Sequence, residues 1–220
     1  MITRVLLADD HPPVRQGLRQ ALAGAGDLTV AGEAYDGRMA VDLASMLMPD
    51  VVLMSVHMPV LDGIGATQEI SAAHARVRVV VLVGSEPDGP VLDALRAGAS
   101  GFLAKDAAAE DVVAAVRLVA RGDSLLAPAL TRRVVEEFAR TPANPRIHPP
   151  EVLRHLTGRE REVLDLLARG LSNAEIRQTL LISEATTKSH VTRVLTKLGL
   201  RERTQVMIWA WEAGLLSTGR

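Results

Sequence analysis

The sequence predicts two domains of different class: a doubly wound α/β domain, followed by an all-α domain of four helices. Three observations support this division. Short apolar runs alternate with amphipathic helical segments over residues 1–124, whereas residues 153–220 carry only helix signals. Residues 125–152, which we interpret as a linker, contain a proline-rich segment. The net charge also changes, from −6 over residues 1–125 to +3 over residues 151–220.

Five apolar runs in the first domain have the length and composition of buried parallel strands. They are Val5–Ala8, Leu28–Ala34, Val51–Met54, Val79–Val83 and Gly101–Ala104. Each is followed by a segment whose apolar residues recur at helical spacing, namely Val14–Ala23, Gly37–Met46, Gly65–Ala73, Val91–Ala97 and Ala108–Ala120. This alternation predicts a five-stranded parallel sheet with helices on both faces.

The linker begins with a helical pattern and ends with prolines. Leu130, Val134 and Phe138 recur at helical spacing within residues 125–140. Four prolines within residues 141–150 exclude a helix interior or an inner strand there. We therefore expect a partly extended connection between the domains.

Four helices with recognisable ends are predicted in the last domain. The first begins at a capping box of Thr157 and Glu160 and stops near Gly170. Ser172 or Asn173 caps the second helix, and Ser183 caps the third. The predicted ranges after the first helix are 174–180, 184–198 and 204–213, with glycines at positions 199 and 214 as stops. A short helix, a tight turn and a longer helix form a helix-turn-helix unit.

The third helix has one apolar and one polar face when its residues are placed about 100° apart. The apolar face carries Thr187, Val191, Val194, Leu195 and Leu198. The opposite face carries Ala185, Ser189, Thr192, Arg193 and Thr196, flanked by Lys188 on one side and by Thr186 and Lys197 on the other. Short hydroxyls and cations without an acid suit a helix that enters the major groove of DNA. An ordinary solvated face is the alternative.

Composition excludes several classes of protein. The chain has no cysteine, so disulfides, thiolate metal sites and cysteine nucleophiles are excluded. No apolar run reaches the length of about 18 residues that a membrane span needs. Asp9 and Asp10 interrupt the only apolar stretch near the N-terminus, so no signal peptide is expected. We expect a soluble cytoplasmic protein.

Four stretches of the last domain resemble the LuxR-type helix-turn-helix domain. They are Leu156–Leu164, Gly170–Ile176, Ser183–Val191 and Lys197–Gly199, within a resemblance that covers about 60 residues. Carried over by position, the resemblance implies groove contacts from Lys188, Ser189 and Thr192, and contacts near phosphates from Thr186, Arg193 and Lys197. It also implies a homodimer on an inverted repeat in double-stranded DNA.

Some residues of this domain have a structural alternative to a functional role. We interpret His190 as mainly structural and Arg177 as solvated. Thr187 replaces the apolar residue that is usual at its position in the family. The last helix resembles the family's dimer contact, but core packing is the alternative that we favour for Trp209.

In the first domain, reactive or charged residues follow the predicted strands. Asp9 and Asp10 follow the first strand, Ser55 the third, and Lys105 the fifth, while Val83 ends the fourth. Sites in open α/β sheets lie at these carboxyl ends. Together with Met58-Pro59 and Asp62-Gly63, the acids and the lysine resemble a receiver domain, and the whole chain resembles the NarL/FixJ family of response regulators. The implied sheet is flavodoxin-like.

Two departures from the receiver pattern change the expected chemistry. Ser55 stands where the family has the aspartate that accepts phosphate, and a serine hydroxyl cannot form an acyl phosphate. The change also removes a carboxylate from the Mg²⁺ site, so we expect at most weak Mg²⁺ binding at Asp9 and Asp10 and no required cofactor. Val83 replaces the hydroxyl residue that binds a phosphoryl oxygen, and Phe102 retains the switch aromatic.

The resulting prediction is a DNA-binding transcription regulator that works without aspartyl phosphorylation. Its control would come from a small ligand, a partner protein or a constitutive dimer. Alternatives are phosphorylation at a shifted site, with Ser85 in place of the lost hydroxyl, and an interaction module that no longer binds DNA. An enzyme with Ser55 as nucleophile is disfavoured, since no Gly-x-Ser-x-Gly motif surrounds it and no histidine base is evidently positioned.

Overall fold

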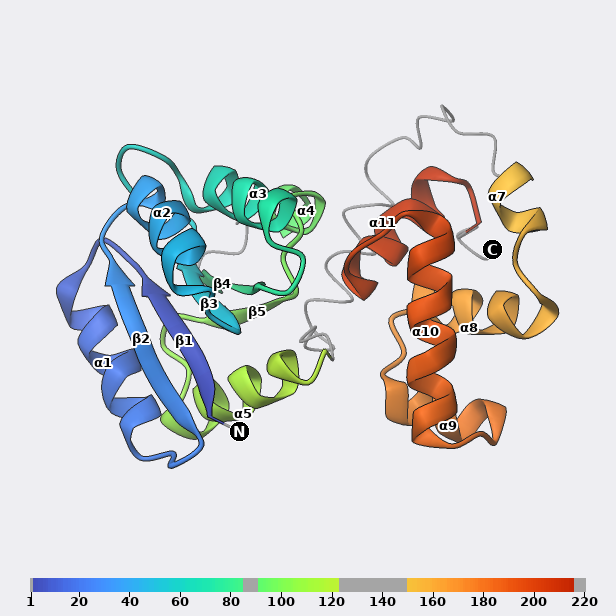
Figure 1. The fold of residues 1–220 in the computed structure, drawn as a ribbon, viewed down its shortest axis with the longest axis horizontal. Helices are drawn as coiled ribbons and strands as arrows, with labels where there is room; N and C mark the ends of the chain where they lie inside the picture. Colours follow the sequence, from blue (N-terminus) through green and yellow to red (C-terminus); the bar gives the residue numbers. More distant parts are fainter. Residues whose placement is uncertain (1, 85–90, 123–149, 216–220) are drawn as a thin grey trace. The chain divides into compact units, whose positions relative to one another are not determined.

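The computed structural model of this protein describes residues 2–84, 91–122 and 150–215, which fall into two compact units (Figure 1). The division between the units lies between Leu125 and Leu126. The predicted linker lies outside the described residues up to position 149, as does its helical pattern over 125–140.

The N-terminal unit contains the predicted five-stranded parallel sheet. Its strands are β1 (Thr3–Ala8), β2 (Leu28–Ala34), β3 (Val51–Ser55), β4 (Arg78–Val83) and β5 (Gly101–Ala104). They are ordered β2-β1-β3-β4-β5, and every neighbouring pair is parallel. This is the flavodoxin-like order, so the predicted fold class is confirmed.

Helices cover both faces of this sheet. They are α1 (Pro12–Ala23), α2 (Gly37–Leu47), α3 (Gly63–Ala73), α4 (Val91–Arg96) and α5 (Ala109–Ala120). Figure 1 shows α1 and α5 on one face, and α2 and α3 on the other. The start of α3 is two residues earlier than predicted, because the Asp62 side chain caps it by accepting a hydrogen bond from the Gly65 amide.

The central strands consist mainly of apolar residues because both of their faces are covered. All five residues of β3 are buried. On one side, Leu7, Leu53 and Leu82 pack with Leu22 of α1 and Val116 of α5. This arrangement explains why the strands appear in the sequence as continuous apolar runs and not as alternating patterns.

The C-terminal unit is all-helical. It comprises α7 (Pro150–Arg154), α8 (Gly158–Ala168), α9 (Asn173–Leu180), α10 (Glu184–Leu198) and α11 (Arg203–Glu212). The last four are the predicted helices, and α7 is a short addition that crosses the predicted end of the linker. The side chains of Thr157, Ser172 and Ser183 cap α8, α9 and α10 as predicted, the first two in complete capping boxes.

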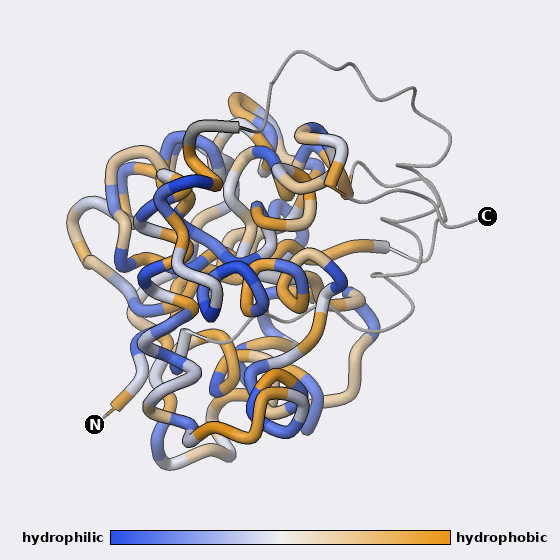
Figure 2. The backbone as a smooth tube through the Cα atoms, turned by 90° about the vertical axis from the view of Figure 1, so that its right-hand side faces the viewer, coloured by the Kyte–Doolittle hydropathy of each residue, from blue (hydrophilic) through white to orange (hydrophobic). Residues whose placement is uncertain are grey.

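One apolar core holds the C-terminal unit together. Val163, Leu167, Ile176, Val194 and Val206 bring α8, α9, α10 and α11 into the same cluster. Hydrophobic and hydrophilic residues alternate along the backbone in Figure 2, as amphipathic helices require. Trp209 is partly buried against this core, which confirms the packing role favoured for it. None of the described helices is long and apolar enough to cross a membrane.

Candidate nucleic-acid interface and receiver pocket

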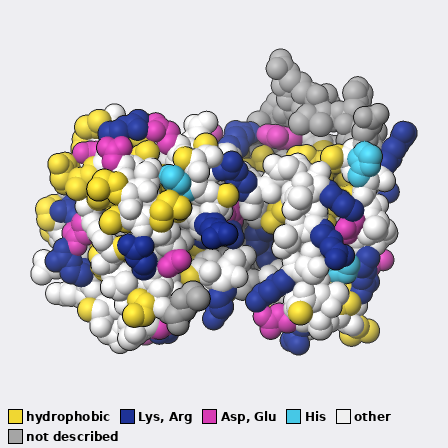
Figure 3. Space-filling view, in the orientation of Figure 1, with side chains coloured by type: hydrophobic (Ala, Val, Ile, Leu, Met, Phe, Trp, Pro, Cys, Tyr) yellow, Lys and Arg dark blue, Asp and Glu magenta, His cyan; other side chains and the backbone are white. Residues whose placement is uncertain are grey.

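Helix α10 buries the face that the sequence assigned to the core and exposes the opposite one. Thr187 and Val194 have no exposed surface, and Val191 is also buried. The residues predicted to face DNA are all exposed, namely Thr186, Lys188, Ser189, Thr192, Arg193 and Lys197. In Figure 3, Lys and Arg side chains are interspersed over α10 among uncharged side chains. The helix therefore presents a polar surface of the composition that was predicted.

The exposed side chains of α10 differ in how strongly they are held. Lys188 Nζ lies 2.9 Å from the Glu184 carboxylate one turn earlier. Thr192 Oγ1 donates to the Lys188 carbonyl oxygen at 2.9 Å, which leaves its lone pairs facing outward. The Arg193 side chain makes no hydrogen bond or ion pair with another described residue. Arg193 is thus free to reach a phosphate without first breaking a contact within the protein.

Lys197 has a partner inside the protein that the sequence did not reveal. Its Nζ donates to Glu160 Oε2 at 2.6 Å and to the His155 carbonyl oxygen at 2.9 Å. Glu160 also accepts the Thr157 backbone N–H at 2.8 Å. The Lys197 ammonium, followed by the Thr157 amide, lowers the pKa of Glu160 from 4.5 to about 2. The pair joins α10 to the start of α8. Lys197 therefore helps to hold α10 in position and also forms part of its exposed surface.

Two arginines that sequence reasoning missed hold the helix ends in place. Arg159 Nη2 donates to the Leu180 carbonyl oxygen at the end of α9, at 2.5 Å. Arg203 donates to the Leu171 carbonyl oxygen and to Asn173 Oδ1 at the start of α9. No local pattern marks these residues, since their partners lie 21 to 32 positions away in the chain.

Other residues noted in this domain adopt structural positions. Thr187 stands where the family usually has an apolar residue. Its buried hydroxyl donates a hydrogen bond to the Ser183 carbonyl oxygen at 3.0 Å, so it has a partner within the helix. His190 is half-buried, and its Nδ1 atom is buried without a hydrogen-bond partner among the described residues. Arg177 is exposed, as expected for a solvated side chain. The side chain of Trp211 lies outside the described residues.

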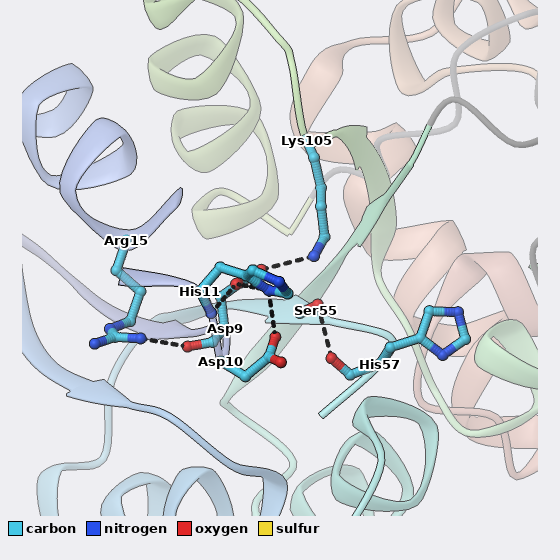
Figure 4. A network of polar contacts seen from close by, with 7 residues as sticks. All are labelled: Asp9, Asp10, His11, Arg15, Ser55, His57 and Lys105. Carbon is cyan, nitrogen blue, oxygen red and sulfur yellow. Dashed lines mark hydrogen bonds and ion pairs between the residues drawn. The ribbon is translucent and has the colours of Figure 1, made fainter. Parts of the chain in front are cut away.

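The predicted strand-end residues of the N-terminal unit do meet at one edge of the sheet (Figure 4). Asp9 has no exposed surface, and its Oδ2 accepts from Lys105 Nζ at 2.8 Å. The other oxygen of Asp9 accepts the His11 backbone N–H, also at 2.8 Å. Arg15 donates to the Asp9 carbonyl oxygen at 2.7 Å. The buried carboxylate is therefore satisfied by groups of this chain alone.

His11 is a member of this pocket that the sequence analysis did not single out. Its Nδ1 lies 2.8 Å from Asp10 Oδ1, and its ring is largely exposed. His57, by contrast, points away from the acids in Figure 4. Adjacency to Asp9 and Asp10 in the sequence was the signal that could have identified His11.

Both departures from the receiver pattern lie at the expected strand ends. Ser55 is the last residue of β3, has no exposed surface, and directs its hydroxyl to the His57 carbonyl oxygen at 3.4 Å. Val83 ends β4 and is partly buried. Phe102 is almost fully buried on β5, as its core-like strand suggested. Ser85, the alternative hydroxyl, lies outside the described residues.

The pocket residues fit Mg²⁺ poorly. Magnesium demands near-octahedral oxygen coordination and is usually held by carboxylates. Oxygen and nitrogen atoms of Asp9, Asp10 and His11 lie within 4.8 Å of one another. However, both Asp9 oxygens already accept hydrogen bonds, one from the cationic Lys105, and Ser55 offers only a neutral hydroxyl. Asp10 is left as the main carboxylate for an ion.

Each of the two units matches a known protein family. Residues 5–117 match the response regulator receiver domain, and residues 154–210 match the LuxR family of bacterial regulatory proteins. The chain is 38% identical to the uncharacterized transcriptional regulatory protein YxjL of Bacillus subtilis, with 97% of each chain covered. It is 37% identical to the nitrate/nitrite response regulator NarL of Escherichia coli K12, with 93% of each covered.

Solved structures show the same relationship. The response regulator ChrA of a heme-sensing two-component system is 34% identical over 98% of this chain and 99% of its own, with a TM-score of 0.54. The receiver domain of a putative NarL from Mycobacterium tuberculosis is 38% identical, with a TM-score of 0.52, and covers 55% of this chain and 98% of its own.

A receiver fold followed by a LuxR-type helix-turn-helix unit defines a DNA-binding response regulator. The chain belongs to this family, in its NarL-type branch. The relatives named above are a transcriptional regulatory protein and a response regulator, in agreement with the DNA-binding class that the sequence favoured.

Proposed function

We propose that this protein regulates transcription by binding a specific inverted repeat as a homodimer, and that phosphorylation of an aspartate does not control it. The exposed polar face of α10 supports the first part of the proposal. The buried serine at the end of β3 supports the second part. The protein would act on DNA in the cytoplasm.

The satisfied pocket is the observation that carries phosphorylation independence. A receiver phosphate needs an acceptor carboxylate, a hydroxyl that binds a phosphoryl oxygen, and a cation. Here Ser55 provides no acceptor carboxylate, Val83 provides no hydroxyl at the end of β4, and Lys105 is already paired with Asp9. No cofactor is required, and Mg²⁺ binding through Asp9 and Asp10 is weak.

Control then comes from another source. The pocket is less anionic than that of a phosphorylated receiver because position 55 carries no carboxylate. In addition, the cations Lys105 and Arg15 lie against Asp9. A neutral or anionic small ligand, or a partner protein, would therefore be accepted at this edge, or the dimer would be constitutive.

Incubation with acetyl phosphate followed by intact-mass measurement tests the proposal. No increase of 80 Da is expected for the wild-type chain, because no acyl phosphate can form at position 55. The matched control is Ser55→Asp, which restores the acceptor and is expected to gain alkali-labile mass. An alkali-labile phosphate on the wild-type chain would overturn the proposal.

DNA selection from a random duplex library tests the other half. The wild-type chain is expected to enrich an inverted repeat. Arg193→Ala should weaken binding to all sequences and reduce the slope of log affinity against log salt by about 1, as loss of a phosphate contact does. Lys188→Ala should cost about 5- to 100-fold and relax the preference at one base pair.

Arg169→Ala is the control for these variants, since Arg169 is an exposed cation at the end of α8 and is not part of α10. It should bind DNA as the wild type does. Equal effects of all three substitutions would refute the assignment of α10 as the DNA-reading helix.

A further inference from the structure

Leu181, in the turn between α9 and α10, combines an exposed apolar side chain with a strained backbone conformation. Its side chain is 91% exposed, although it is fully apolar. Its backbone is left-handed, with φ 53° and ψ 46°, a conformation that bulky side chains rarely adopt. Among the described residues, three non-glycine residues have positive φ, and Leu181 is the one in the helical unit. Glycine or asparagine would suit this position better.

The turn holds Leu181 rigidly. Its N–H donates to the Arg177 carbonyl oxygen, and the Ile182 N–H donates to the same oxygen at 3.2 Å. Arg159 binds the preceding carbonyl oxygen, that of Leu180. Two residues later, Ser183 caps α10 by accepting the Thr186 N–H at 3.1 Å. An exposed leucine is thus held at a defined place immediately before α10.

That place lies where a helix-turn-helix unit meets DNA. The N-terminal part of the second helix contacts base edges in the major groove. Resting on the proposed function, we propose that Leu181 makes an apolar contact with DNA at the edge of each half-site and contributes to sequence preference. Its targets are the apolar atoms of DNA that a groove edge offers, namely the thymine methyl group or the deoxyribose.

The surroundings of Leu181 favour DNA over a protein partner. Nearby exposed side chains are polar or basic, namely Arg177, Gln178 and Thr179 on α9. Protein-binding sites usually form contiguous apolar patches. The other exposed large apolar side chain described in this unit is Leu215, which follows α11. A single apolar side chain among polar ones matches a groove in which methyl groups alternate with polar edges.

The test compares wild type with Leu181→Asn and Leu181→Gly on the operator that the wild-type full-length chain selects. Both variants are expected to lose about 5- to 20-fold in affinity, as partial burial of one leucine implies. The salt slope should be unchanged, since no charge is removed. The melting temperature should not fall, because both residues tolerate the left-handed backbone. Met46→Asn, at an apolar residue that is 78% exposed in the other unit, is the control and should bind normally.

Replacing each operator thymine by deoxyuridine identifies the group that is contacted. If deoxyuridine at one position lowers the affinity of wild type but does not lower that of Leu181→Asn further, Leu181 contacts the thymine methyl group there. If deoxyuridine is tolerated at every position while Leu181→Asn still binds more weakly, Leu181 contacts the deoxyribose. Variants that bind the operator with wild-type affinity would overturn the inference alone. A wild-type chain that enriches no sequence would overturn the proposed function and this inference with it.

Discussion

Replacement of Lys105 by methionine is expected to destabilise the N-terminal unit, because it leaves the buried Asp9 carboxylate without a cationic partner. Lys105 Nζ lies 2.8 Å from an oxygen of Asp9, a carboxylate with no exposed surface. Methionine retains most of the aliphatic stem and removes the charge. The buried carboxylate then lacks its cationic partner.

The magnitude follows from the contacts that remain. Removing one partner of a buried ion pair typically costs about 3–5 kcal/mol. Two features reduce that cost here. The Lys105 side chain is 28% exposed, so water can reach its place. The second Asp9 oxygen retains the His11 N–H at 2.8 Å. We therefore expect a loss of about 2–3 kcal/mol, which lowers the melting temperature by roughly 6–12 °C for a unit of this size.

Calorimetry on the full-length chain measures this loss. Both tryptophans, Trp209 and Trp211, belong to the C-terminal unit, so their fluorescence identifies the transition that should not move. Adding Asp9→Asn to Lys105→Met removes the stranded charge and should recover most of the stability. A change below about 0.5 kcal/mol on Lys105→Met, or no recovery in the double variant, would refute the pairing argument.

Three further outcomes are expected. A Cβ on Gly63 would lie 1.8 Å from the Ser55 carbonyl oxygen, so Gly63→Ala should destabilise the N-terminal unit by about 3 kcal/mol or more. Gly17→Ala, in α1 where a Cβ meets open space, should stabilise the same unit by about 0.5–1 kcal/mol. Chemical denaturation of the two variants measures both changes. Because the Glu160 pKa is lowered to about 2, its carboxylate stabilises the helical unit above pH 4.5, and this contribution is lost as the pH falls towards 2. Urea unfolding followed by tryptophan fluorescence should therefore show that the free energies of unfolding of wild type and Glu160→Gln approach each other as the pH falls from 4.5 to 2. Lys197→Met should raise the Glu160 pKa towards 4.5, so the variant should lose less stability than wild type between pH 4.5 and pH 2. Persistence of the wild-type profile would contradict the ion pair.

Much of the fold could be predicted from local sequence patterns. The strands β2 and β5 have the predicted bounds, and the capping residues of α8, α9 and α10 were identified correctly. These features depend on residues a few positions apart, whose chemistry is visible in the chain. The burial of Thr187 and Val194 followed from helical periodicity in the same way.

The candidate sites could be predicted only in part. Strand order brings Asp9, Ser55 and Lys105 together as expected, because parallel strands end at the same edge of the sheet. Their individual contacts could not be predicted. The pairing of Lys105 with Asp9 spans 96 positions, and that of Lys197 with Glu160 spans 37. Which of several cations reaches a given carboxylate depends on how helices and strands pack.

The sequence by itself therefore determined the two units, their order, and the identity of the residues at the strand ends and on the face of α10. Side-chain type and spacing carry that information directly. Tertiary structure alone decided that Asp9 is fully paired, that Lys197 supports α8, and that Leu181 is exposed in a strained turn. Those properties depend on distances between segments remote in the chain and on backbone angles, and no local pattern specifies either.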